Sequence, residues 1–118
     1  MSTGSAGPGT SADVQQIVGT YLFALGSGAG SVWITREAIA EFERSFTRKI
    51  TSVLEDERWE SYWNAEKCHL LEYVRAIGRH ASQRVVQQGR VHIDAPDIAA
   101  AIAAVRGQVP IAGRWCPL

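Results

Sequence analysis

The chain has 118 residues, of which 46% are hydrophobic and 20% charged, so it can build one modest core but not two. Its formal net charge of zero removes the simplest argument for wholesale binding to nucleic acid. Two cysteines, Cys68 and Cys116, do not make a disulfide scaffold, and no apolar run reaches membrane-spanning length. We therefore expect a soluble protein with no membrane partner, either cytoplasmic and nucleoid-associated or nuclear.

The first thirty residues divide into three predicted parts. Residues 1–10 are small and polar, and we expect them to be disordered. Apolar residues at helical spacing from Val14 to Leu25 predict a helix over 12–25, capped by Thr10 or Ser11 and ended by Gly26. The glycine-rich run 26–30 follows a helix, whereas a dinucleotide-binding loop follows a strand, so it is interpreted as a flexible linker. Residues 11–30 thus form an extra N-terminal helix and a linker.

Three further helices are predicted, over residues 35–55, 62–88 and 95–106. Short extended pieces fit residues 90–93 and 32–34, and the tail 108–118 is predicted to be extended, with Trp115 as its large apolar residue. No glycine or proline marks the end of the second helix, so its boundary stays open between Leu54 and Asn64. The third helix ends at Gly89, and Asp94 is the expected N-cap of the last one, with Asp97 at its third position.

The long third helix carries an apolar stripe at steps of three and four residues: Leu70, Val74, Ile77, Ala81 and Val85. One short helix cannot bury a stripe of this length, so another element must cover the remainder.

The segment from Gly89 to Ile98 (GRVHIDAPDI) resembles the second loop and last-helix start of archaeal and core histones, and residues 34–39 (ITREAI) resemble the start of the first histone helix. The resemblance implies an all-α, dimeric fold over residues 31–107, in the order helix, long helix, short strand-like loop, helix. It further implies an obligate dimer in which two long helices cross, so that the five stripe residues of each chain form the dimer interface. The resemblance also implies that Arg90 pairs with Asp97. The same pattern occurs in the helical lid of AAA-type ATPases, although this chain has no Walker loop.

Two functions follow from the resemblance and the charges. Residues 61–90 are the one positive region, and four arginines are candidate contacts to the phosphates of double-stranded DNA: Arg75, Arg79, Arg84 and Arg90. Histone-like DNA binding by a dimer is the first hypothesis. Val91 and His92, however, stand where DNA-binding histones carry basic and hydroxyl-bearing loop residues. The alternative is therefore a protein-assembly module, a homodimer or a heterodimer with another histone-fold chain, that does not contact DNA.

Catalytic and metal-binding patterns are weak. Cys68 and His69 point about 100° apart on a helix, and the remaining histidines and cysteine lack zinc-ligand spacing. The acidic residues between Glu55 and Glu60 fit a solvated helix end better than an acid–base pair. We expect no enzyme activity, cofactor, metal or small-molecule substrate. Tryptophans 59 and 63 share one helix face, where they are core or dimer-interface anchors or, alternatively, a partner-binding hot spot.

Overall fold

The computed structural model of the chain describes residues 9–108, so the expectations for residues 1–8 and for the tail 109–118 lie outside it. The described part contains four helices and one pair of two-residue strands. In chain order these are α1 (Ser11–Ala29), β1 (Trp33–Ile34), α2 (Arg36–Val53), α3 (Trp59–Gln87), β2 (His92–Ile93) and α4 (Ala95–Gln108). The predicted all-α class is confirmed, and the connection that had no clear boundary in the sequence is residues 54–58.

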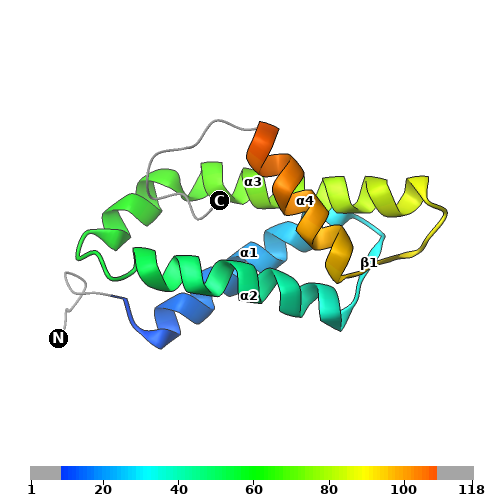
Figure 1. Ribbon diagram of the computed structural model, residues 1–118. Helices are drawn as coiled ribbons and strands as arrows, with labels where there is room; N and C mark the ends of the chain where they lie inside the picture. The colour runs from blue at the N-terminus through cyan, green and yellow to red at the C-terminus, as the bar shows by residue number, and fades with distance from the viewer. Residues whose placement is uncertain (1–8, 109–118) are drawn as a thin grey trace.

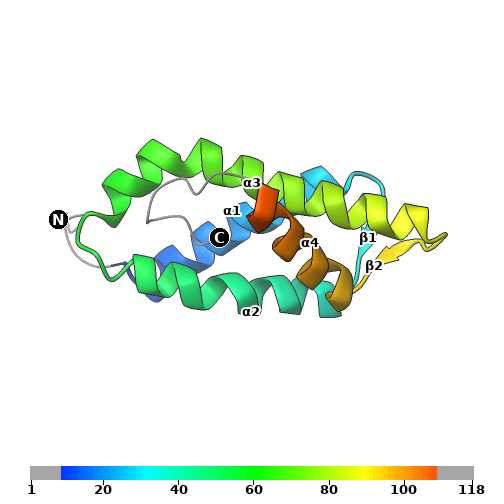
Figure 2. The ribbon, with the colours of Figure 1, turned by 45° about the horizontal axis from the view of Figure 1, so that its top comes forward.

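The four helices pack around one core. Helices α2 and α3 run antiparallel along the length of the molecule, and α1 and α4 lie between them on opposite sides (Figures 1 and 2). Each of α1 and α4 packs against both α2 and α3. The core therefore lies between α2 and α3 and is closed from one side by α1 and from the other by α4.

Side-chain caps fix where two of the helices begin. The hydroxyl of Thr10 accepts a hydrogen bond from the N–H of Asp13 at 3.3 Å, and the Asp13 carboxylate accepts one from the N–H of Thr10 at 2.8 Å. Thr35 caps α2 in the same way by accepting from the N–H of Ala38 at 3.2 Å. Glycine 89, with a φ of 70°, follows α3 and turns the chain toward β2.

Helix α1 is longer than the sequence predicts, because the predicted end at Gly26 is wrong. The helix continues to Ala29 and ends at Gly30, which has a φ of 66°. One glycine of α1 and one of α3 serve packing between the two helices. A Cβ on Gly28 of α1 would lie 1.9 Å from the carbonyl oxygen of Arg75, and a Cβ on Gly78 of α3 would lie 2.2 Å from the carbonyl oxygen of Leu25. The backbones of α1 and α3 thus touch at a crossing that only glycine permits. This is a structural role for a run that was interpreted as a linker.

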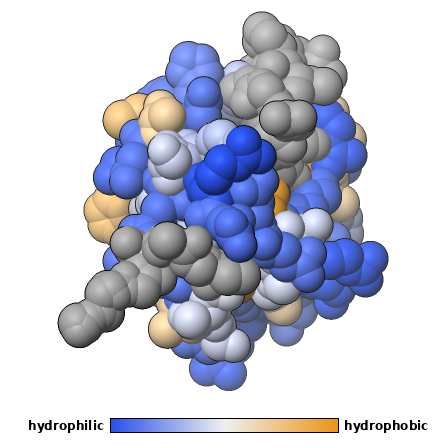
Figure 3. All heavy atoms as spheres, turned by 90° about the vertical axis from the view of Figure 1, so that its left-hand side faces the viewer, coloured by the Kyte–Doolittle hydropathy of each residue, from blue (hydrophilic) through white to orange (hydrophobic). Residues whose placement is uncertain are grey.

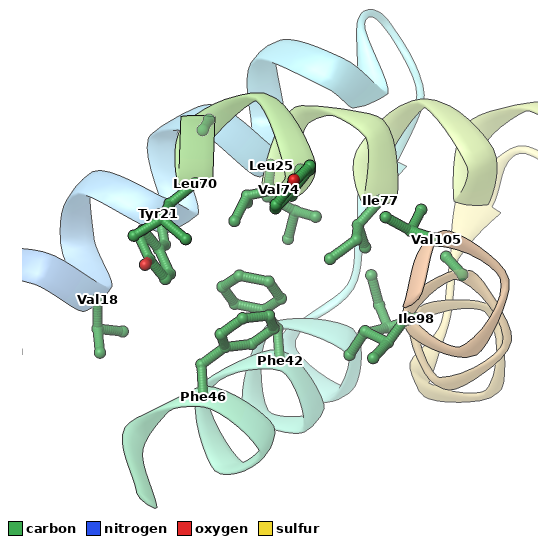
Figure 4. Close-up of a cluster of buried hydrophobic side chains, with 14 of the residues drawn as sticks. Val18, Tyr21, Leu25, Phe42, Phe46, Leu70, Val74, Ile77, Ile98 and Val105 are labelled. Atoms are coloured by element: carbon green, nitrogen blue, oxygen red, sulfur yellow. The ribbon is translucent and has the colours of Figure 1, made fainter. Parts of the chain in front are cut away.

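The apolar stripe of α3 is buried inside the single chain. Leu70 and Val74 are each 1% exposed, and the other three stripe residues, Ile77, Ala81 and Val85, are each 0% exposed. Figure 4 shows Tyr21 and Leu25 of α1 beside Leu70 and Val74, with Phe42 and Phe46 of α2 facing them. Ile98 and Val105 of α4 extend this cluster around Ile77. The stripe of α3 was expected to be covered by a second copy of the chain. In the structure, α1 and α4 of the same chain cover it.

The two short strands join the start of α2 to the start of α4. They pair in parallel, Trp33 opposite His92 and Ile34 opposite Ile93. Ile93 is fully buried, and Thr35 donates hydrogen bonds from its N–H and its hydroxyl to the carbonyl oxygen of Ile93, each at 3.0 Å. The predicted extended piece over residues 90–93 is shorter in the structure, because Val91 precedes β2 and is 68% exposed. The strand pair therefore holds the start of α2 next to the segment that connects α3 to α4.

Candidate functional site

Asp97 is the centre of a buried ionic cluster in the first turn of α4. Its side chain is 2% exposed, and it accepts two hydrogen bonds from the guanidinium of Arg90, at 2.5 and 2.9 Å. The Nε of Arg84 on α3 donates to the same carboxylate at 3.0 Å. The N–H of Asp94 donates to it at 2.8 Å and so closes the start of α4. The expected Arg90–Asp97 pair is present, and Arg84 is a further member.

The cluster stabilises the charged form of the carboxyl group. The hydrogen bonds from Arg90 lower the pKa of Asp97 from 3.8 to about 2, with smaller contributions from the N–H of Asp94 and from Arg84, while burial acts in the opposite direction. Because Asp97 also holds the loop before β2 to the end of α3, one residue fixes three elements. A buried carboxylate shared by two arginines fits this structural role.

The four arginines proposed to bind DNA do not form one free track. Arg84 and Arg90 are held by Asp97, and Arg75 forms an ion pair with Glu72 one turn before it. Arg79 is exposed, and no ion pair involves it in residues 9–108. Three of the four guanidinium groups therefore already face a carboxylate.

A second feature is a set of exposed apolar and aromatic side chains at the end of the molecule where α3 stops and the strands pair. Figure 2 shows the position of these backbone elements. We call it the terminal patch; it consists of Trp33, Val86, Val91 and His92. Trp33 is 75% exposed, and its ring lies 6.5 Å from that of His92 in an edge-to-face arrangement. Val86 and Val91 flank the turn between α3 and β2 and are 61% and 68% exposed. Large exposed apolar side chains grouped in this way mark interaction surfaces.

The tryptophans fall into different environments. Trp59 is buried, Trp63 is half-buried against the ring of Tyr21, and Trp33 is exposed. Trp115 lies outside the described residues. The helical spacing in the sequence correctly placed Trp59 and Trp63 on one helix face. It carried no signal that Trp33 is exposed, because the position of Trp33 depends on pairing with a strand 59 positions later.

The remaining candidates do not come together as a site. Cys68 and His69 are both exposed, and His69 contacts the ring of Tyr73. Between residues 9 and 108, no three or more His, Cys, Asp or Glu side chains are grouped so that they could hold a metal ion. No helix in the same span is long and apolar enough to cross a membrane.

In comparisons with known proteins, no family model, curated protein or solved structure matches this chain. A function is therefore proposed from the geometry of the structure.

Proposed function

We propose that this chain is a protein-assembly module that pairs with a second copy of itself through the terminal patch. The observation that carries the proposal is Trp33, a large aromatic side chain that is 75% exposed on the two-residue strand β1, which pairs with β2. Tryptophan is among the residues that contribute most binding energy at protein interfaces, and a paired strand holds it in place at little entropic cost.

The relation to histone domains is part of this proposal. It is supported by the order of helices and strands over residues 31–107 and by the Arg90–Asp97 pair. Histone-fold subunits that serve assembly without contacting DNA are the nearest functional analogy. In this chain the pairing surface would be the terminal patch instead of the stripe of α3, which is already buried.

A second copy is the partner that the charges favour. The formal net charge of zero lets two identical chains approach without net repulsion. The patch also contrasts with the opposite end of the molecule, where the surface is mostly hydrophilic (Figure 3). An interface that a chain forms with itself joins the same surface of both copies, so one patch per chain is sufficient.

Sedimentation equilibrium of the purified protein tests the proposal. We expect a reversible dimer whose dissociation constant rises by about tenfold or more in Trp33→Ser, because a central tryptophan typically contributes at least this much. Phe23→Ser is the matched control: Phe23 is 81% exposed but lies on α1, outside the patch, and its loss should leave the dimer unchanged. A wild-type protein that stays monomeric to about 100 μM, a concentration at which even weak dimers form, would contradict the proposal, as would equal effects of the two substitutions.

DNA-backbone binding is the second candidate. It is favoured by Arg75 and Arg79, which lie one turn apart on α3, but only Arg79 lacks an ion pair in the described structure. An anisotropy titration with duplex DNA over a salt series distinguishes the functions. If the logarithm of the association constant falls linearly with the logarithm of the salt concentration, with a slope of about −0.9 per neutralised phosphate, the result favours DNA binding. The assembly module predicts no binding to the duplex.

A further inference from the structure

A cleft of about 200 Å³ lies between the first half of α1 and the start of α3. Its lining combines two indole rings, Trp59 and Trp63, with the carboxylate side chains of Asp13 and Glu60. Thr20 and Asn64 contribute neutral polar groups. We call this the indole cleft. It is at the opposite end of α3 from the terminal patch, so dimer formation through the patch leaves it open.

The chemistry of the lining selects for a cation. Indole rings attract cations through the negative potential over their faces, more strongly than the rings of tyrosine or phenylalanine do. A nearby carboxylate adds a direct charge attraction, and its effect is larger in a half-buried site than in open water. Both Asp13 and Glu60 are half-buried.

Among residues 9–108, no basic side chain lines this cleft. The nearest in sequence, Arg58, is held by the carboxylate of Asp56 at 3.3 Å and lies over the ring of Tyr62, 5.3 Å from its centre. Asp13 uses its Oδ2 atom to accept from the N–H and the hydroxyl of Thr10. Glu60 forms no hydrogen bond or ion pair with any residue between 9 and 108, so it is the carboxylate available to a ligand.

We infer that the indole cleft binds an organic ammonium group, with Trp59 and Trp63 contacting its apolar substituents and Glu60 balancing its charge. The volume of about 200 Å³ accommodates a quaternary ammonium ion or the end of a lysine side chain. Both sources present the same chemistry, a positive nitrogen with attached methylene or methyl groups. This inference does not depend on the proposed dimer.

Two-dimensional NMR of the indole N–H groups tests the inference with two probes. Tetramethylammonium chloride represents the quaternary cation, and Nα-acetyl-lysine methylamide represents a lysine side chain. Either probe should shift the Trp59 and Trp63 resonances in a saturable way while the exposed Trp33 resonance stays in place. The probe with the lower dissociation constant identifies the source of the ammonium group.

Three controls make the result decisive. Glu60→Gln should weaken binding by about fivefold, as expected for the loss of one charge interaction at a half-buried site. Glu66→Gln removes a carboxylate from the same helix outside the cleft and should change nothing. Neopentyl alcohol has a similar shape without the charge and should not bind. The inference is overturned by absence of saturable shifts, by equal shifts with the alcohol at matched ionic strength, or by equal effects of the two substitutions.

Discussion

At the scale of single residues, Asp97 connects more of the fold than any other polar side chain in the described structure. It is the one charged or polar residue that is fully buried there, and its carboxylate joins α3, the loop before β2 and the start of α4. A buried charge of this kind is tolerated because two arginines and a backbone N–H satisfy it. Removing its negative charge would leave those arginines facing a neutral group, so the cluster should depend on pH.

The lowered pKa of Asp97 predicts how stability changes in acid. Because the folded-state pKa of about 2 is below the ordinary 3.8, the charged carboxylate stabilises the folded state above pH 4. This contribution, about 2 kcal/mol, should be lost as the pH falls from about 4 to about 2. Urea unfolding at a series of pH values measures it.

Asp97→Asn isolates this effect from the titration of the other carboxylates. The difference in unfolding free energy between the wild type and the variant should be largest near neutral pH and should shrink by about 2 kcal/mol below pH 4. If the two proteins lose stability in parallel between pH 5 and pH 2, Asp97 does not carry the proposed charge interaction.

At the scale of secondary structure, the crossing of α1 and α3 depends on two glycines. The backbone of each helix occupies the space where a side chain of the other would stand, at Gly28 and Gly78. This close approach lets Tyr21 and Leu25 reach the stripe of α3 and bury it (Figure 4). The crossing, more than any loop, determines that α1 belongs to the core.

Substitution at the crossing should therefore cost stability even though alanine favours helices. Gly78→Ala places a Cβ 2.2 Å from a backbone carbonyl oxygen of α1, which must move away. We expect a loss of about 1–3 kcal/mol of unfolding free energy, the usual range for overpacking. Thermal or urea unfolding followed by circular dichroism measures the loss.

The control is Gly19→Ala, since Gly19 lies within α1, the other helix of the crossing, but has nothing within 4 Å of its added Cβ. It should stabilise the protein by about 0.5–1 kcal/mol, because alanine has the higher helix propensity. Equal effects of the two substitutions would show that α1 and α3 do not cross as closely as described.

The helical stripes and the Arg90–Asp97 spacing were readable in the sequence because each is a local pattern. The continuation of α1 through Gly26 could not be predicted in this way. The glycine at position 28 is needed because of a contact with Arg75, which is far away in the chain. For the same reason no local pattern predicts that Arg84 joins Asp97, or that Trp33 pairs with His92. The stripe of α3 was identified correctly, while the element that covers it was misassigned, because apolar spacing shows that a face is buried but not by what.

At the scale of the whole molecule, the chain closes its own core and presents different chemistry at its two ends. The terminal patch is apolar and aromatic and sits where α3 ends, whereas the indole cleft near the start of α3 is acidic and aromatic. Because these surfaces are separated along one helix, the proposed pairing and the proposed ammonium binding would not compete. We propose that the folded unit is a single chain, and that pairing adds to a fold already complete.

Helix content measured during dimer dissociation tests this claim most directly. Circular dichroism at 222 nm should stay constant as the protein is diluted through the dissociation constant found by sedimentation. Trp33→Ser, studied below its raised dissociation constant so that it is monomeric, should unfold cooperatively at a urea concentration that does not depend on protein concentration. Loss of helix on dilution, or a midpoint for this variant that rises with protein concentration, would instead mean that two chains share one core, as the crossed-helix dimer requires.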